Sequence, residues 1–275
     1  MSIALTAESA RPLPATGALE RVASMLLACG TPEGVLPPTA LYNEGWLVRL
    51  VLDWFARHPP TRHPLDVLPG SSWRSEALLQ SAFAPRFRGD PLAESFTHAD
   101  GVIGNLRAGS GRGDVLPASG ARQFTVVEAK MMSGLSAGTT RAKSYNQAAR
   151  NVACLAEALA RSGADVATIR AGFVLLAPAS QIDAGGFGTW CDNDHIEAVV
   201  RARVDDYQGQ RHAWLEAAFL SALPAISIDV LSWEAVIAHI GAIAPHDAET
   251  LNAFYEQGLI FNRPARPSRA PSAAT

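Results

Sequence analysis

Two charged side chains interrupt an apolar, β-branched run, and their spacing is the first feature of this sequence that could do chemistry. The run is Phe-Thr-Val-Val-Glu-Ala-Lys at residues 124–130, which places Glu128 and Lys130 two positions apart. In a β-strand, residues two apart point to the same face of the sheet. A strand covered by helices on both faces is expected to be apolar throughout, so these charges need a reason. A solvated ion pair at the end of the strand is the alternative explanation.

The use of lysine at position 130 is unusual for this composition. The chain has 23 basic residues, of which only Lys130 and Lys143 are lysines, so composition alone would have supplied arginine. Arginine keeps its proton at working pH, whereas a partly buried lysine can shift its pKa and position a water molecule. The retained lysine therefore indicates that lysine chemistry is required at position 130.

A further acid, Asp100, begins the β-rich segment Asp-Gly-Val-Ile-Gly-Asn-Leu at residues 100–106. A meander of strands joined by a hairpin would bring Asp100 beside Glu128. Two adjacent carboxylates repel each other unless a cation lies between them, and hard oxygen ligands suit Mg²⁺. Such a metal could generate hydroxide and stabilise the leaving oxygen of a phosphodiester. Asp114 is an alternative first acid, but it lies in a Gly/Ser-rich loop where nothing fixes its side chain.

This arrangement resembles the PD-(D/E)XK nuclease superfamily. The motif reads Ala99-Asp100, then 27 intervening residues, then Glu128-Ala129-Lys130, with alanine in place of the family's proline. The resemblance covers about residues 72–178. It implies an α/β, restriction-endonuclease-like core, in which a mixed central sheet is flanked by helices in the order helix, three strands, helix, strand.

The resemblance also implies an activity and roles for particular residues. Asp100, Glu128 and the backbone carbonyl of Ala129 would be metal ligands for Mg²⁺ or Mn²⁺, and Lys130 would orient the attacking water. The implied reaction is hydrolysis of phosphodiester bonds in nucleic acid, with DNA the expected substrate.

A helix predicted over residues 72–83, with Ser72 as its N-cap, carries a further candidate. Glu76 matches the glutamate that family members often carry on the helix before the first strand. A first-turn glutamate stabilised by the helix dipole explains the residue equally well. Glu44, near the start of a second predicted helix over residues 40–57, is a rival for the same role.

A long helix predicted over residues 142–162 follows the motif. Gln147 matches in rough position a glutamine that the recombination-nuclease branch uses near its active site. Lys143 and Arg150 share its helix face and could hold phosphates without reading the base sequence. A solvated helix face is the alternative.

Three weaker hypotheses compete with the nuclease. Gly134-Leu-Ser136-Ala-Gly138 satisfies the G-x-S-x-G pattern of a serine hydrolase with Ser136 as nucleophile, but no oxyanion loop precedes it. Residues 191–195 carry metal-capable atoms, although their spacing is more typical of a turn that caps the next helix. A catalytically inactive nuclease fold that only binds is the third alternative; the presence of both acids and the lysine favours an enzyme.

Composition bounds the remaining possibilities. The net charge of −3 argues against a chain coated in basic charge, yet residues 121–170 hold seven basic and three acidic residues, which leaves room for a local nucleic-acid groove. A homodimer would be one way to supply further basic surface. No apolar stretch of membrane-spanning length, no signal peptide and no paired cysteines are present, so we expect a cytoplasmic protein without a membrane partner.

We expect one domain over residues 1–275. It would comprise an N-terminal helical extension (16–71), the nuclease-like core (72–178), a C-terminal elaboration of helices and a strand (179–262), and a disordered tail (263–275).

Overall fold

The computed structural model describes residues 16–109 and 114–263, and it divides the chain into two compact units between residues 41 and 42. The first unit contains α1 (Thr16–Leu27) and the short helix η1 (Pro38–Ala40). The second contains all the strands and remaining helices of the described residues. The boundary falls inside the segment 16–71, so α2 (Glu44–Arg57) belongs to the unit with the sheet. The predicted disordered tail lies, apart from Arg263, outside the described residues.

The second unit is built on a mixed sheet in the strand order β1-β2-β5-β6-β7. These strands are β1 (Ser72–Leu79), β2 (Thr97–Gly104), β5 (Gln123–Ala129), β6 (Arg170–Ala177) and β7 (Ile226–Ser232). The pairs β1–β2 and β2–β5 are antiparallel, whereas β5–β6 and β6–β7 are parallel. A separate hairpin pairs β3 (Leu106–Ala108) with β4 (Val115–Pro117). The α/β class with a mixed sheet flanked by helices is therefore confirmed.

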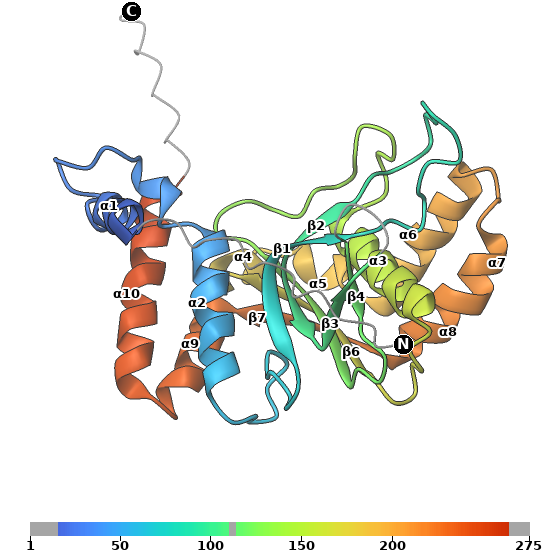
Figure 1. The fold of residues 1–275 in the computed structure, drawn as a ribbon. Coiled ribbons are helices and arrows are strands. Elements are labelled where there is room, and N and C mark those ends of the chain that lie inside the picture. Colours follow the sequence, from blue (N-terminus) through green and yellow to red (C-terminus); the bar gives the residue numbers. More distant parts are fainter. Residues whose placement is uncertain (1–15, 110–113, 264–275) are drawn as a thin grey trace, which may run out of the picture. The chain divides into compact units, whose positions relative to one another are not determined.

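Helices cover both faces of this sheet (Figure 1). One face packs against α2, α9 (Trp233–Gly241) and α10 (Pro245–Phe261), and the other packs against α3 (Gln147–Ser162) and α6 (Asn193–Asp206). The remaining short helices are α4 (Ala179–Asp183), α5 (Phe187–Trp190), α7 (His212–Trp214), η2 (Leu215–Phe219), α8 (Leu220–Ala222) and η3 (Leu223–Ala225). Every residue of β5 is buried, as expected for a strand between two helical layers.

The helix predicted over residues 72–83 is wrong, because this segment is strand β1. Its backbone pairs with β2 from Ser72 opposite Gly104 to Leu79 opposite Thr97. Ser72 is therefore not an N-cap. Segments this short carry ambiguous periodicity, and here the hydrogen bonds to β2 decide the conformation. The helix that precedes the strands is α2, which begins at Glu44 after Asn43 accepts a hydrogen bond from the Trp46 N–H.

The helix predicted over residues 142–162 begins later than expected. Asn146 is its N-cap and accepts a hydrogen bond from the Ala149 N–H at 2.9 Å, so α3 starts at Gln147. Lys143 consequently lies in the loop before the helix, and the prediction that it shares a helix face with Gln147 and Arg150 is wrong.

Within the described residues, no helix has the length and apolar character needed to cross a membrane.

Candidate active site

Asp100 and Glu128 meet where β2 and β5 separate. The last residue pair of this ladder is Gly101 with Val127, and continuing the same register places Asp100 opposite Glu128. Beyond that pair, Asp100 Oδ2 accepts a hydrogen bond of 2.7 Å from the Ala129 N–H. The main chain of β5 is thus held by a side chain of β2 at this point, which brings the two acids to the same edge of the sheet.

Glu128 is buried and both of its carboxylate oxygens are held by donors. Oε1 accepts from Lys130 Nζ and from Gln147 Nε2, each at 2.6 Å. Oε2 accepts from Asn151 Nδ2 at 2.9 Å. These donors fix the direction of the carboxylate, because a buried acceptor that lost one of them would incur a desolvation cost.

The main chain around Lys130 is held equally firmly. Its N–H donates to the Leu176 carbonyl at 2.7 Å, and its own carbonyl accepts from Trp233 Nε1 at 2.8 Å. Lys130 is only 9% exposed. Lys130 is therefore nearly buried, with its main chain held by two neighbouring elements, β6 and α9, and its ammonium held by Glu128.

The site carries more negative than positive charge. Burial, followed by the negative charge of Glu128, raises the pKa of Asp100 to about 7, and the Ala129 N–H and the Lys130 ammonium oppose this rise only in part. Glu76 adds a smaller upward effect on the same pKa. Two carboxylates beside one ammonium leave a local deficit of positive charge that a bound cation would remove.

This charge deficit predicts how stability depends on pH. The unfolded chain loses the Asp100 proton near its ordinary pKa of 3.8, whereas the folded chain keeps it until about pH 7. Between these values the folded state binds more protons, so metal-free stability should fall by roughly 1 to 4 kcal/mol as the pH rises from about 4 to about 8. Thermal denaturation of the wild type and of Asp100→Asn should show the decline in the wild type alone. Parallel pH profiles for the two proteins would contradict the assignment.

The residues present fit a small, hard cation. Within residues 16–109 and 114–263, no group of three or more His, Cys, Asp and Glu side chains is arranged to hold a metal ion. Asp100 and Glu128 would therefore bind with main-chain and water oxygens as the other ligands, which suits Mg²⁺ because it retains several waters. The position of Asp100 opposite Glu128 on adjacent strands, which adds to the effect of burial in raising the pKa of Asp100, is the feature that favours a cation here.

Glu76 reaches the site from a different element than predicted. It lies on β1 between the pairs Ser75–Gly101 and Ala77–Ala99, which places it opposite Asp100 in register. Its φ of 51° lies in the left-handed region, where a non-glycine residue is strained. Its exposed carboxylate pairs with Arg49 at 3.1 Å. Three acids on three adjacent strands thus lie at one level of the sheet.

Glu44, the rival for the role of Glu76, is the first residue of α2 and is half-buried. It lines a separate pocket of about 280 Å³ together with Met131 and Met132, which follow directly after Lys130.

The sequence interpretation missed Asn151. It lies one helical turn after Gln147 on α3, so the two amides lie on the same helix face and reach the two oxygens of Glu128. The spacing of four residues was a usable signal. Asn151 Oδ1 is buried and has no hydrogen-bond partner among the described residues.

The structure places the remaining candidate residues, Arg150, Lys143 and Asp114, at three different locations. Arg150 points into a pocket beside the site, whereas Lys143 is exposed on the preceding loop. Asp114 is buried and pairs with Arg161 at 2.6 Å, near the far end of α3. Because Gln147 and Arg161 are 14 residues apart on that helix, about 21 Å separates Asp114's partner from the site. Asp114 therefore does not take the place of Asp100.

The segment containing Ser136 does not form a nucleophile elbow. Such an elbow requires a helix immediately after the serine, but α3 begins only at Gln147. Ser136 Oγ donates to the Gly138 carbonyl at 2.7 Å, and the Ser136 N–H donates to Gln147 Oε1 at 3.1 Å. That second bond orients the Gln147 amide so that its nitrogen faces Glu128.

The metal-capable residues at 191–195 form a helix cap, as the alternative interpretation predicted. Asp192 Oδ1 accepts from the His195 N–H at 3.0 Å and begins α6.

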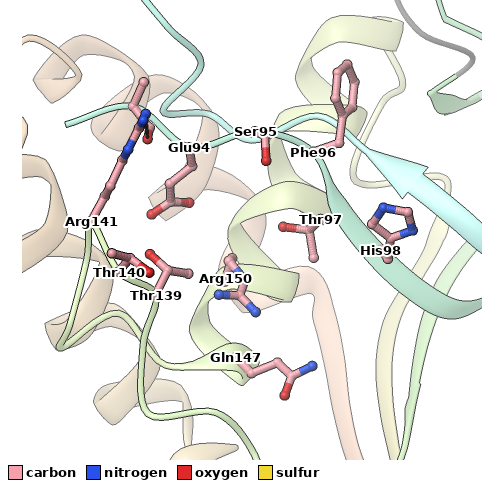
Figure 2. Close-up of a pocket in the computed structure, with 11 residues that line it drawn as sticks. Glu94, Ser95, Phe96, Thr97, His98, Thr139, Thr140, Arg141, Gln147 and Arg150 are labelled. Carbon is pink, nitrogen blue, oxygen red and sulfur yellow. Dashed lines mark hydrogen bonds between the residues drawn. The ribbon is translucent and has the colours of Figure 1, made fainter. Parts of the chain in front are cut away.

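A pocket of about 640 Å³ opens beside Gln147 (Figure 2). It is lined by residues 93–98, which lead into β2, by residues 139–141 of the loop after β5, and by Gln147 and Arg150 of α3. Gln147 is therefore shared between this pocket and the carboxylate site.

No protein-family model matches this chain, and no curated protein or solved structure matches it either.

Proposed function

We propose that this chain is a metal-dependent nuclease of the PD-(D/E)XK type that hydrolyses phosphodiester bonds of nucleic acid. DNA is the expected substrate, and Mg²⁺ or Mn²⁺ is the expected cofactor. The observation that carries the proposal is the junction at Glu128. Its carboxylate lies beside that of Asp100, accepts from Lys130 Nζ at 2.6 Å and is oriented by Gln147 and Asn151.

The order of elements supports the same class. From α2 the chain runs through β1, β2 and β5, with the β3–β4 hairpin as an insertion, and then through α3 and β6. This is the helix, three-strand, helix, strand order that the resemblance to PD-(D/E)XK nucleases implies, with α2 in the place that residues 72–83 were expected to fill.

Each side chain has a role that follows from its position. Asp100 and Glu128, with the Ala129 carbonyl, would hold the metal, which when bound supplies Lewis acidity and lowers the pKa of a water molecule. Lys130 presents its remaining N–H donors beside Glu128 and orients the water that attacks phosphorus. Gln147 and Asn151 keep the Glu128 carboxylate in one direction.

The direct test is cleavage of linear and supercoiled DNA by the full chain with Mg²⁺ or Mn²⁺, and in EDTA. Cleavage is expected with either metal and none in EDTA. Ser136→Ala is the matched control, because Ser136 contacts Gln147 through its main-chain N–H, and this variant should cleave like the wild type. Full activity in EDTA would contradict the metal dependence, and loss of an esterase activity in Ser136→Ala would favour the serine hydrolase instead.

Lys143 and Arg150 are proposed phosphate contacts. Neutralising each to methionine should weaken DNA binding regardless of sequence, because counterion release accompanies each contact. The slope of log K against log salt should become shallower by about 0.7 to 0.9 per lost contact. Binding titrations at several salt concentrations measure this slope. A double variant with the wild-type slope would mean that neither residue contacts a phosphate.

A further inference from the structure

The pocket beside Gln147 has unbalanced positive charge. Glu94 is the acid in its wall, and this carboxylate is already paired with Arg203 at 3.1 Å and accepts from Ser81 Oγ. The half-buried Arg150 donates its main-chain N–H to the Asn146 carbonyl, but its guanidinium makes no hydrogen bond or salt bridge among the described residues and acts on Glu94 only at longer range, where it opposes the rise in the pKa of that carboxyl. Arg141 bonds to main-chain carbonyls, at 3.0 Å to that of Asp90, rather than to a carboxylate. Two guanidinium groups at this pocket thus have no carboxylate in hydrogen-bond contact among the described residues.

The other polar groups suit an anion as well. Figure 2 shows Arg150 in the middle of the lining side chains, with Thr139 and Thr140 on one side and Thr97 and His98 on the other. Thr139 Oγ1 accepts from the Ala142 N–H, which leaves its hydroxyl proton to donate. A planar guanidinium beside hydroxyl donors is an arrangement that binds the oxygens of a phosphate.

The size of the pocket limits which form of nucleic acid can enter. A volume of about 640 Å³ lies within the range of about 300–1,000 Å³ that holds one small organic ligand. An unpaired nucleotide can enter such a pocket, whereas a stacked base pair in a duplex cannot unless it is first opened. Because Gln147 lines the pocket and also bonds Glu128, a nucleotide held there would lie next to the phosphate at the carboxylate site.

We propose that this pocket binds one unpaired nucleotide of the substrate, with its phosphate on Arg150, so that the chain selects single-stranded DNA over intact duplex. The proposal rests on the proposed nuclease function and names the substrate form that the same site accepts. Arg150 selects the unpaired strand, whereas the exposed Lys143 outside the pocket contributes only to general phosphate attraction.

The experiment compares a fluorescently labelled single-stranded oligonucleotide with the blunt duplex of the same sequence, by anisotropy in EDTA, where no cleavage is expected. The wild type should bind the single strand on the order of tenfold more tightly or better. Arg150→Met should lower single-strand affinity by about 10-fold or more, the loss of a charge-assisted hydrogen bond, and should lower duplex affinity much less. Arg150→Lys should recover part of the loss.

Lys143→Met is the matched control, because it removes one positive charge outside the pocket and should weaken both probes alike. Thermal denaturation of each variant checks that the fold is intact. Equal wild-type affinity for the two probes, or equal losses on both in Arg150→Met, would overturn the proposal. Selective binding of the single strand without any cleavage in Mg²⁺ would support the nucleotide pocket and contradict the nuclease function. Cleavage without selective binding would support the nuclease function and contradict the nucleotide pocket.

Discussion

Replacing Asp100 by asparagine is expected to abolish Mg²⁺-dependent cleavage while the protein stays folded. The asparagine side chain keeps an oxygen that can accept the Ala129 N–H but carries no charge, so it no longer provides an anionic metal ligand. The lost stabilisation of the transition state is several kcal/mol, which corresponds to on the order of 10³-fold or more in rate. Turnover on a defined DNA substrate measures the effect.

Metal binding provides a readout that does not depend on activity. Mg²⁺ should raise the melting temperature of the wild type more at pH 8 than at pH 5. At pH 5 the Asp100 carboxyl, whose pKa is raised to about 7, holds a proton and is neutral. At pH 8 it has lost that proton and is an anionic ligand for the metal. In Asp100→Asn this stabilisation should be largely lost. If Asp100→Asn retains wild-type turnover, or if Mg²⁺ raises its melting temperature as much as that of the wild type, Asp100 is not a metal ligand.

Glu128→Gln should also abolish cleavage, but with a different effect on the fold. The wild-type carboxylate accepts from three donors, and the amide would direct its own N–H groups toward some of them. Buried donors that lose their acceptor cost about 1–3 kcal/mol each. We therefore expect Glu128→Gln to lower the melting temperature, in contrast to Asp100→Asn, which removes a charge repulsion.

Lys130→Arg is expected to lower turnover by on the order of 10²-fold or more while DNA affinity changes little. The ammonium lies 2.6 Å from Glu128 Oε1 and is nearly buried, so a larger planar guanidinium cannot place its donors at the same point. The loss corresponds to a positioned group acting on the attacking water. Single-turnover rates separate this effect from binding.

The chain supplies its own control, because Lys143 is its only other lysine. Lys143→Arg makes the same chemical change at an exposed position outside the carboxylate site and should retain wild-type turnover. If Lys130→Arg turns over like the wild type, the lysine is only a counter-charge for Glu128. Lys130→Met, with its melting temperature, shows whether the loss comes from the missing ammonium or from a disrupted core.

The placement of Glu128 beside Lys130 could be predicted from the sequence because it depends on local order. The run at 124–130 is apolar enough to be a buried strand, and extended backbone places Glu128 and Lys130 on one face. In the structure β5 ends at Ala129, and Lys130, directly after it, still contacts Glu128. The helix predicted over residues 40–57 has a strong apolar periodicity, so its existence and its end at Arg57 followed from local sequence. Its start is at Glu44, four residues later than predicted, because Asn43 caps it.

What the sequence alone did not decide were features created by pairing between distant segments. Residues 72–79 carry no decisive period, and they are a strand because their N–H and C=O groups bond to β2. Glu76 consequently lies opposite Asp100 through strand register rather than through a helix face. The same holds for Asn151, whose amide is just one more polar group on α3 until β5 places the Glu128 carboxylate against it. Spacing along the chain determines which side chains share a face, but only the packed sheet and helices determine which faces meet, because those contacts form between residues far apart in sequence.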